Sequence, residues 1–167
     1  METRIYVACL AAYNNGKLHG RWIDANQEAD AIRDEVQAML KESPEAQAEE
    51  WAIHDYDLGG VKISESEDFE RVSEVAGLLA EHGEAFAAYA GNVGVDSVTA
   101  EGFQDSYRGH YDSEQAFAEE LVSELYSEKE LGPLANYIDY ESYANDLFMG
   151  DFYSVNGEGG VYVFSNH

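Results

Sequence analysis

The acidic residues of this chain lie among apolar residues that recur with the spacing of folded helices and strands, and this pattern constrains its fold most. The formal net charge is −25, from 34 Asp and Glu against 9 Lys and Arg in 167 residues. Acidic chains that stay disordered contain few hydrophobic residues, whereas 45% of these residues are hydrophobic and only 2 are proline. The chain can therefore bury a core, and its carboxylates must be displayed on a folded surface.

The negative charge is distributed over the whole chain. Residues 1–60 contain 12 acidic and 5 basic residues, residues 61–103 contain 9 and 2, and residues 104–167 contain 13 and 2. The net charges of these segments are therefore −7, −7 and −11. An acidic tail would instead concentrate the charge at one end, outside the periodic segments.

Residues 1–60 have the pattern of a small α+β domain. Alternating apolar residues predict three strands, at residues 4–10, 18–23 and 51–54. Asn14-Asn15-Gly16 predicts the turn between the first two strands, because Asn and Gly tolerate positive φ. Apolar residues at helical spacing then predict a helix that is capped by Asp24 or Asn26 and ends near Leu40.

Residues 61–103 predict a small helical bundle. Apolar residues recur at helical spacing over residues 69–79 and again over residues 86–90. After a glycine-containing break, Ser97 is expected to cap a short helix that ends near Phe103.

Residues 104–167 predict mixed helices with a short antiparallel sheet. Ser113 is the expected N-cap of a helix with Phe117, Leu121 and Leu125 on its inner face. The other expected elements are a short helix at 132–137, a helix at 139–147, and hairpin strands at 152–155 and 161–164. The predicted fold class is α+β, with three domains at residues 1–60, 61–103 and 104–167.

Several protein classes are disfavoured by the sequence. An acidic surface does not suit direct binding to nucleic acid or to an anionic membrane, since both need a positive face. No stretch approaches the ~20 apolar residues of a membrane span, and no signal peptide precedes the first strand. Cys9 is the only cysteine, so an intramolecular disulfide is impossible. We expect a soluble, cytoplasmic protein in which Cys9 is a small buried residue.

The sequence also lacks the common signatures of catalysis and of metal binding. It contains no nucleophile elbow, zinc-protease motif, P-loop or dinucleotide fingerprint. The nearest approach to a calcium loop, which begins at Asp55, has Ser66 where a bidentate glutamate is needed. No two of the five histidines are three or four residues apart. We therefore expect no enzyme activity, no cofactor and no metal.

Three hypotheses from different classes fit a folded acidic surface. It can be an adaptation to high salt, it can belong to an acidic hydrolase with an unrecognised site, or it can copy the phosphate array of DNA. B-form DNA carries about two charges per base pair, so a net charge of −25 corresponds to about 12 base pairs for each chain. Such a surface competes with DNA for a basic groove without presenting any base edges.

Three groups of residues point to a known family by their order and spacing. The first is Ile5-Tyr6-Val7 with Tyr13-Asn14-Asn15-Gly16 and Gly20-Arg21-Trp22, and the second is Glu49-Glu50-Trp51-Ala52-Ile53-His54-Asp55-Tyr56. The third runs from Tyr107 to Leu147 and includes His110-Tyr111-Asp112-Ser113, Phe117-Ala118-Glu119-Glu120-Leu121 and Leu134-Ala135-Asn136-Tyr137-Ile138-Asp139-Tyr140. Through these groups the chain resembles the ArdA antirestriction proteins of conjugative plasmids and transposons. The middle segment matches only in acidity and helical pattern, and Asn145 stands where the family usually has a basic residue.

The resemblance implies an elongated homodimer of three-domain chains that mimics bent B-form DNA. It implies binding to the DNA groove of type I restriction–modification enzymes, chiefly their methyltransferase and specificity core. Restriction, and in some cases modification, is then inhibited, and the family has no enzymatic activity or cofactor. The family's antirestriction motif corresponds to residues 124–140 of this chain.

Two sets of residues are candidates for the functional surface. The expected DNA-mimic acids belong to the third segment, where the charge excess is largest: Asp112, Glu114, Glu119, Glu120, Glu124, Glu128, Glu130, Asp139, Glu141 and Asp146. The expected antirestriction-motif or dimer-contact residues are Tyr107, Tyr111, Leu131, Leu134, Tyr137, Ile138 and Tyr140. The apolar motif residues are expected to be buried in a core or a dimer contact, and Tyr107 and Tyr111 to be exposed. Neutralising a single acid is expected to change little.

Overall fold

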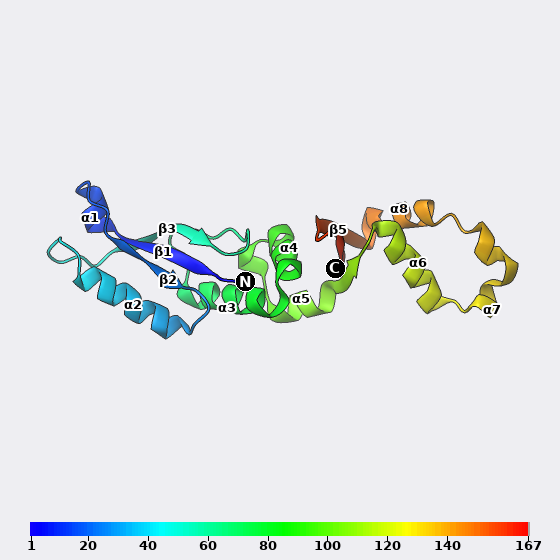
Figure 1. Cartoon of the computed structure of the whole chain (residues 1–167), viewed down its shortest axis with the longest axis horizontal. Coiled ribbons are helices and arrows are strands. Elements are labelled where there is room, and N and C mark those ends of the chain that lie inside the picture. The colour runs from blue at the N-terminus through cyan, green and yellow to red at the C-terminus, as the bar shows by residue number, and fades with distance from the viewer. Residues whose placement is uncertain (167) are drawn as a thin grey trace. The chain divides into compact units, whose positions relative to one another are not determined.

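A computed structural model describes residues 1–166 and has the predicted α+β fold. The chain divides into two compact units, Met1–Val98 and Thr99–His167. Each unit contains one three-stranded antiparallel sheet together with helices (Figure 1). The division into domains at 1–60, 61–103 and 104–167 stays a prediction.

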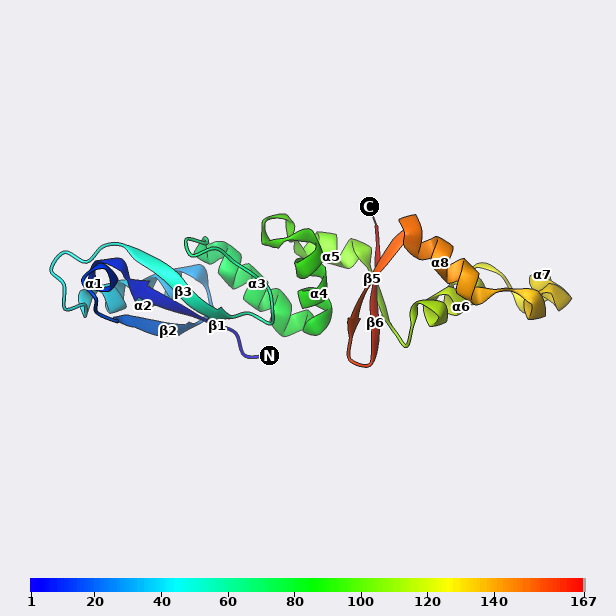
Figure 2. The ribbon, with the colours of Figure 1, turned by 90° about the horizontal axis from the view of Figure 1, so that it is seen from above.

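The sheet of the first unit has strand order β2-β1-β3, with β1 (Arg4–Cys9) between β2 (Gly20–Asp24) and β3 (Trp51–Asp57). All three predicted strands are confirmed. The connection from β1 to β2 contains a short helix, α1 (Leu10–Asn14), before the expected turn. Figures 1 and 2 show α2 (Ala29–Lys41) along one face of this sheet. Its apolar stripe is buried there: Ile32, Val36, Met39 and Leu40.

Two further helices complete the first unit. Asp68 caps α3 (Phe69–His82) by accepting a hydrogen bond from the backbone N–H of Glu70. Gly83, at φ +60°, allows the chain to turn directly into α4 (Glu84–Val93), because a residue without Cβ tolerates this conformation. A 3-10 turn, η1 (Val95–Ser97), follows. The helical spacing predicted for this region is confirmed.

The sheet of the second unit has strand order β4-β6-β5. It consists of β4 (Tyr107–Tyr111), β5 (Phe152–Gly157) and β6 (Gly160–Ser165). Figure 2 shows the hairpin of β5 and β6, whose two-residue turn at Glu158 and Gly159 has positive φ at both positions. The predicted hairpin is confirmed.

The helices of the second unit are α5 (Ala100–Ser106), α6 (Glu114–Leu125), α7 (Glu128–Leu131), η2 (Gly132–Tyr137) and α8 (Tyr140–Gly150). Helices α6 and α8 pack together against the sheet. Their shared core consists of Phe117, Ala118, Ala144, Leu147, Val161 and Val163. The predicted Ser113 cap is confirmed, since its hydroxyl accepts a hydrogen bond from the N–H of Ala116.

Three local expectations are wrong. Helix α2 begins after Glu28 because the Asp24 side chain instead closes a local turn with the N–H of Asn26. Thr99, rather than Ser97, caps α5. Leu125 is 57% exposed, because α6 ends there and extends beyond the core that buries Phe117. By contrast, Cys9 is fully buried as expected, with its Sγ 3.3 Å from the hydroxyl oxygen of Ser43.

Candidate acidic interface

The carboxylates of this protein are displayed at its surface. None of the 34 Asp and Glu side chains belongs to a buried residue. Four belong to half-buried residues, which are Glu35, Glu45, Glu67 and Glu114, and all the others are exposed. Because charged groups lose little solvation in this arrangement, a compact fold can carry a large net charge.

The two units compensate this charge differently. In the first unit, Arg33 bridges α2 and α3 by pairing with Asp30 and Glu70, while Lys17 pairs with Glu45 across 2.8 Å. Residues 99–167 contain 14 acidic residues but only Arg108 and Lys129 as basic ones. In the described part of that unit, no ion pair within 4.0 Å is formed. The second unit therefore presents negative charge with almost no internal neutralisation.

The ten predicted acids are spread over α6, α7, α8 and their flanking residues. Helix α6 carries Glu119, Glu120 and Glu124, all of which are exposed. Seven others complete the set: Asp112 before α6, Glu114 at its start, Glu128 and Glu130 on α7, Asp139 before α8, and Glu141 and Asp146 on α8. Glu114 is the single member of this set that is half-buried.

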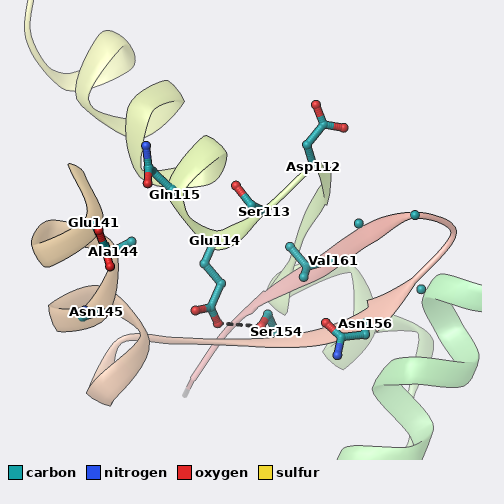
Figure 3. A pocket seen from close by; sticks show the side chains of 13 residues that line it. Asp112, Ser113, Glu114, Gln115, Glu141, Ala144, Asn145, Ser154, Asn156 and Val161 are labelled. Atoms are coloured by element: carbon teal, nitrogen blue, oxygen red, sulfur yellow. Dashed lines mark hydrogen bonds between the residues drawn. The ribbon is translucent and has the colours of Figure 1, made fainter.

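The fold brings Asp112, Glu114 and Glu141 together around an open concavity of about 880 Å³. Its walls come from the start of α6, from α8 and from the β5–β6 hairpin (Figure 3). Ser154 on β5 donates a 2.7 Å hydrogen bond from its hydroxyl to Glu114 Oε2. No lysine or arginine lines this concavity. It is therefore an acidic hollow whose walls come from three separate parts of the sequence and whose carboxylates come from two of them.

Two of the predicted acids also have local structural roles. Glu130 forms a capping box with Ser127 at the start of α7, in which each residue accepts a hydrogen bond from the backbone N–H of the other. Asp139 caps α8 through Ser142, whose backbone N–H and hydroxyl lower the pKa of the Asp139 carboxyl. These contacts orient both carboxylates, and the lowered pKa of Asp139 favours its charged form.

The tyrosines before α6 are part of the fold. Tyr107 and Tyr111 are half-buried, so the prediction that they are exposed is wrong. Tyr107 stacks on Phe103 at 5.0 Å between ring centroids, and Tyr111 meets Phe117 edge-on at 5.1 Å. Burial raises the pKa of both phenols, and nearby carboxylates, such as Glu158 beside Tyr107, raise it further.

Residues 124–140, which are expected to correspond to the antirestriction motif, are more exposed than the sequence suggested. Leu134 is 68% exposed and Tyr137 is 83% exposed, so neither is buried in the core of its own chain. Leu131, Ile138 and Tyr140 are half-buried. The exposed apolar side chains lie on η2 and its neighbours, where a second protein surface can cover them.

Sequence reasoning missed the concavity because its walls are far apart in the chain. Ser154 is 40 residues from Glu114, and Asn156 on the same strand also lines the hollow. Neither residue belongs to a motif, and no local pattern predicts the contact. The calcium-like residues Asp55 and Asp57 belong to strand β3. Within residues 1–166, no group of three or more His, Cys, Asp or Glu side chains is arranged to hold a metal ion.

No helix in the described part of the chain is both long and apolar enough to span a membrane. A comparison with individual curated proteins gives no match. The family model described as antirestriction protein (ArdA) matches residues 5–162, which is nearly the whole chain. Together with the folded acidic surface, this match shows that the chain belongs to the ArdA family of antirestriction proteins.

Proposed function

We propose that this protein inhibits type I restriction–modification enzymes by standing in for DNA. Its acidic surface occupies the DNA-binding groove of the methyltransferase and specificity core, so that DNA is excluded. Restriction is blocked, and modification can be blocked in some cases through the same groove. The observation that supports this proposal most is the exposed and almost unpaired charge of the second unit, with 14 acidic residues against 2 basic ones.

The energetics of such a mimic follow those of DNA. A groove that binds about two phosphate charges per base pair also attracts a surface with a net charge of −25, equivalent to about 12 base pairs. Binding displaces the counterions of both surfaces, so its affinity falls as the salt concentration rises. Because the mimic offers no base edges, it can block enzymes that recognise different DNA sequences.

A homodimer belongs to the same proposal. Two chains would present the charge of about 25 base pairs, which is the footprint of a large DNA enzyme. A dimer contact needs exposed apolar residues that can be buried between the two chains. Leu134 and Tyr137, at 68% and 83% exposure, meet this requirement.

The test is to titrate the purified protein into a type I restriction enzyme that is cleaving unmodified plasmid. We expect the plasmid to be protected, and protection to weaken as salt is added. The matched control is a type II restriction enzyme, which cuts the same plasmid without a methyltransferase and specificity core. Cleavage that continues at a clear molar excess of the protein would overturn the proposal.

A further inference from the structure

An apolar groove with an acidic rim lies within the first unit. It has a volume of about 310 Å³ and is formed by α2, β3 and the segment that leads into α3. Val36, Trp51 and Phe69 supply apolar side chains to it, and the rings of Trp51 and Phe69 stack at 4.5 Å between centroids. Val36 and Phe69 are buried, whereas Trp51 is half-buried.

The rim of this groove is strongly negative. Glu67 and Asp68 line it, and Asp30 and Glu70 approach it through Arg33. Arg33 is the one basic residue in the lining, and it already pairs with carboxylates from α2 and α3. The lining therefore offers no unpaired basic residue to an acidic occupant. A basic partner would be attracted to this rim.

We infer that this groove is an anchor site for a large apolar or aromatic side chain that lies between lysine or arginine residues on the target enzyme. This inference rests on the proposed function and adds a contact that DNA itself does not make. The groove lies at the small end of the ~300–1,000 Å³ range of ligand pockets, so it suits one side chain. Water that covers the Trp51 ring would be released when that side chain enters.

An anchor of this kind gives the mimic an advantage over the DNA that it displaces. Charge attraction to a basic groove is available to both competitors and weakens as salt is added. Apolar burial is available only to the protein and depends weakly on salt at moderate concentrations. Interface hot spots have this form, with an aromatic pocket at the centre and a polar rim that excludes water.

The test fills the groove without changing the charge. Ser66 is exposed in the segment that leads into α3, and Gln37 is exposed on α2, so they line the groove from different elements. The variants are Ser66→Trp and Gln37→Trp, and the matched control is Ser66→Ala, which leaves the groove open. The affinity of each for the purified methyltransferase and specificity core is measured at several salt concentrations, with circular dichroism to verify folding.

We expect each tryptophan variant to bind about 30-fold more weakly, which is the loss of one hot-spot residue. The slope of log affinity against log salt should be unchanged, and Ser66→Ala should bind like the unmodified protein. Folded tryptophan variants that retain full affinity would overturn the inference, and so would a shallower salt slope, because the groove would then act through charge. A tryptophan variant that changes from dimer to monomer would show that a second copy occupies the groove. If the unmodified protein fails to bind the enzyme at all, the proposed function itself is overturned.

Discussion

Ser154 donates a hydrogen bond of 2.7 Å from its hydroxyl to Glu114 Oε2, and this contact joins β5 to the first turn of α6. Glu114 lines the acidic concavity and is half-buried, so this residue is less exposed to water than the other predicted acids. The hydrogen bond compensates part of that lost solvation. It also fixes the position of one carboxylate on the wall of the hollow.

Replacing Ser154 with alanine should therefore destabilise the protein. We expect Ser154→Ala to lower the free energy of unfolding by about 1 kcal/mol, because the half-buried Glu114 side chain loses a hydrogen-bond partner. Urea denaturation followed by circular dichroism measures this change. Ser97→Ala, at an exposed serine of η1, is the control and should have little effect. Equal stability of Ser154→Ala and the unmodified protein would contradict the prediction.

Loss of surface charge should weaken inhibition in a graded way. Neutralising one exposed acid, such as Glu120→Gln, should change the affinity for the restriction enzyme less than threefold, because a distributed charge array has no dominant residue. Neutralising six together should weaken binding strongly and make its salt dependence shallower. The six are Glu119, Glu120, Glu124, Glu128, Glu141 and Asp146, and this set leaves out the helix caps Glu130 and Asp139.

The control for the sixfold variant exchanges Glu and Asp at the same positions, which preserves every charge. Its affinity should stay near that of the unmodified protein. Inhibition abolished by a single neutral substitution at one of the six would argue against a distributed mimic, and so would equal inhibition by the sixfold neutral variant.

The ion pair between Arg33 and Glu70 should make the stability of the first unit depend on pH in the acidic range. The hydrogen bond from Arg33 is the main cause that lowers the pKa of Glu70 from 4.5 to about 2, and contacts with Asp68 and the backbone add to it. Since the folded pKa is below the unfolded one, the pair stabilises the fold above about pH 4.5. This stabilisation is lost as the pH falls towards 2.

Thermal unfolding of Glu70→Gln at a series of pH values tests this prediction. The variant should have a lower Tm than the unmodified protein at pH 7, and the difference should vanish by about pH 2. Asp34→Asn removes one negative charge at an exposed position on α2, so it corrects for the general relief of charge repulsion. A Tm difference that does not depend on pH, after this correction, would refute the assignment.

The sequence predicted the elements well wherever local signals decide them. The Ser113 cap with the spacing of Phe117 and Leu121 predicted α6, and the glycine-rich turn predicted the hairpin of β5 and β6. Strand β4 was missed, because Gly109 at φ +128° interrupts its alternation and shifts its register against β6. The pairing with β6 that stabilises this strand is a tertiary contact.

The candidate surface was only partly predictable for the same reason. Burying a charge costs free energy, so the sequence could predict that the acidic residues are exposed. Nine of the ten predicted acids are exposed, and Glu114 is half-buried. The concavity depends on which walls meet, and the contact between Ser154 and Glu114 has no signature in the sequence. Leu134 and Tyr137 were expected in a core or a dimer contact, and their exposure on η2 shows that they are not part of the core of α6 and α8.

Salt should stabilise the protein without being required for folding. Both units have a buried apolar core, which stabilises the fold at any salt concentration. Repulsion among the exposed carboxylates opposes folding, and salt screens this repulsion. If 1 M NaCl relieves about 2 kcal/mol of repulsion, Tm rises by roughly 4–8 °C for a chain of this size. Protection from amide hydrogen exchange should rise more in residues 99–166, where the charge is least paired. A chain that unfolds at low salt would support the alternative of an adaptation to high salt.

The exposed apolar side chains of η2 should control association between two chains. Leu134 and Tyr137 lose almost no contacts within their own chain when they are truncated, since they are 68% and 83% exposed. The double variant Leu134→Ala with Tyr137→Ala should therefore fold normally but raise the Kd of the dimer by about 100-fold or more. Sedimentation velocity over a range of concentrations measures this shift. Leu18→Ala, at a residue of the first unit that is 88% exposed, is the matched control and should remain a dimer. An unmodified protein that is monomeric at high concentration, or a double variant that dimerises normally, would place the dimer contact elsewhere or remove it from the proposal.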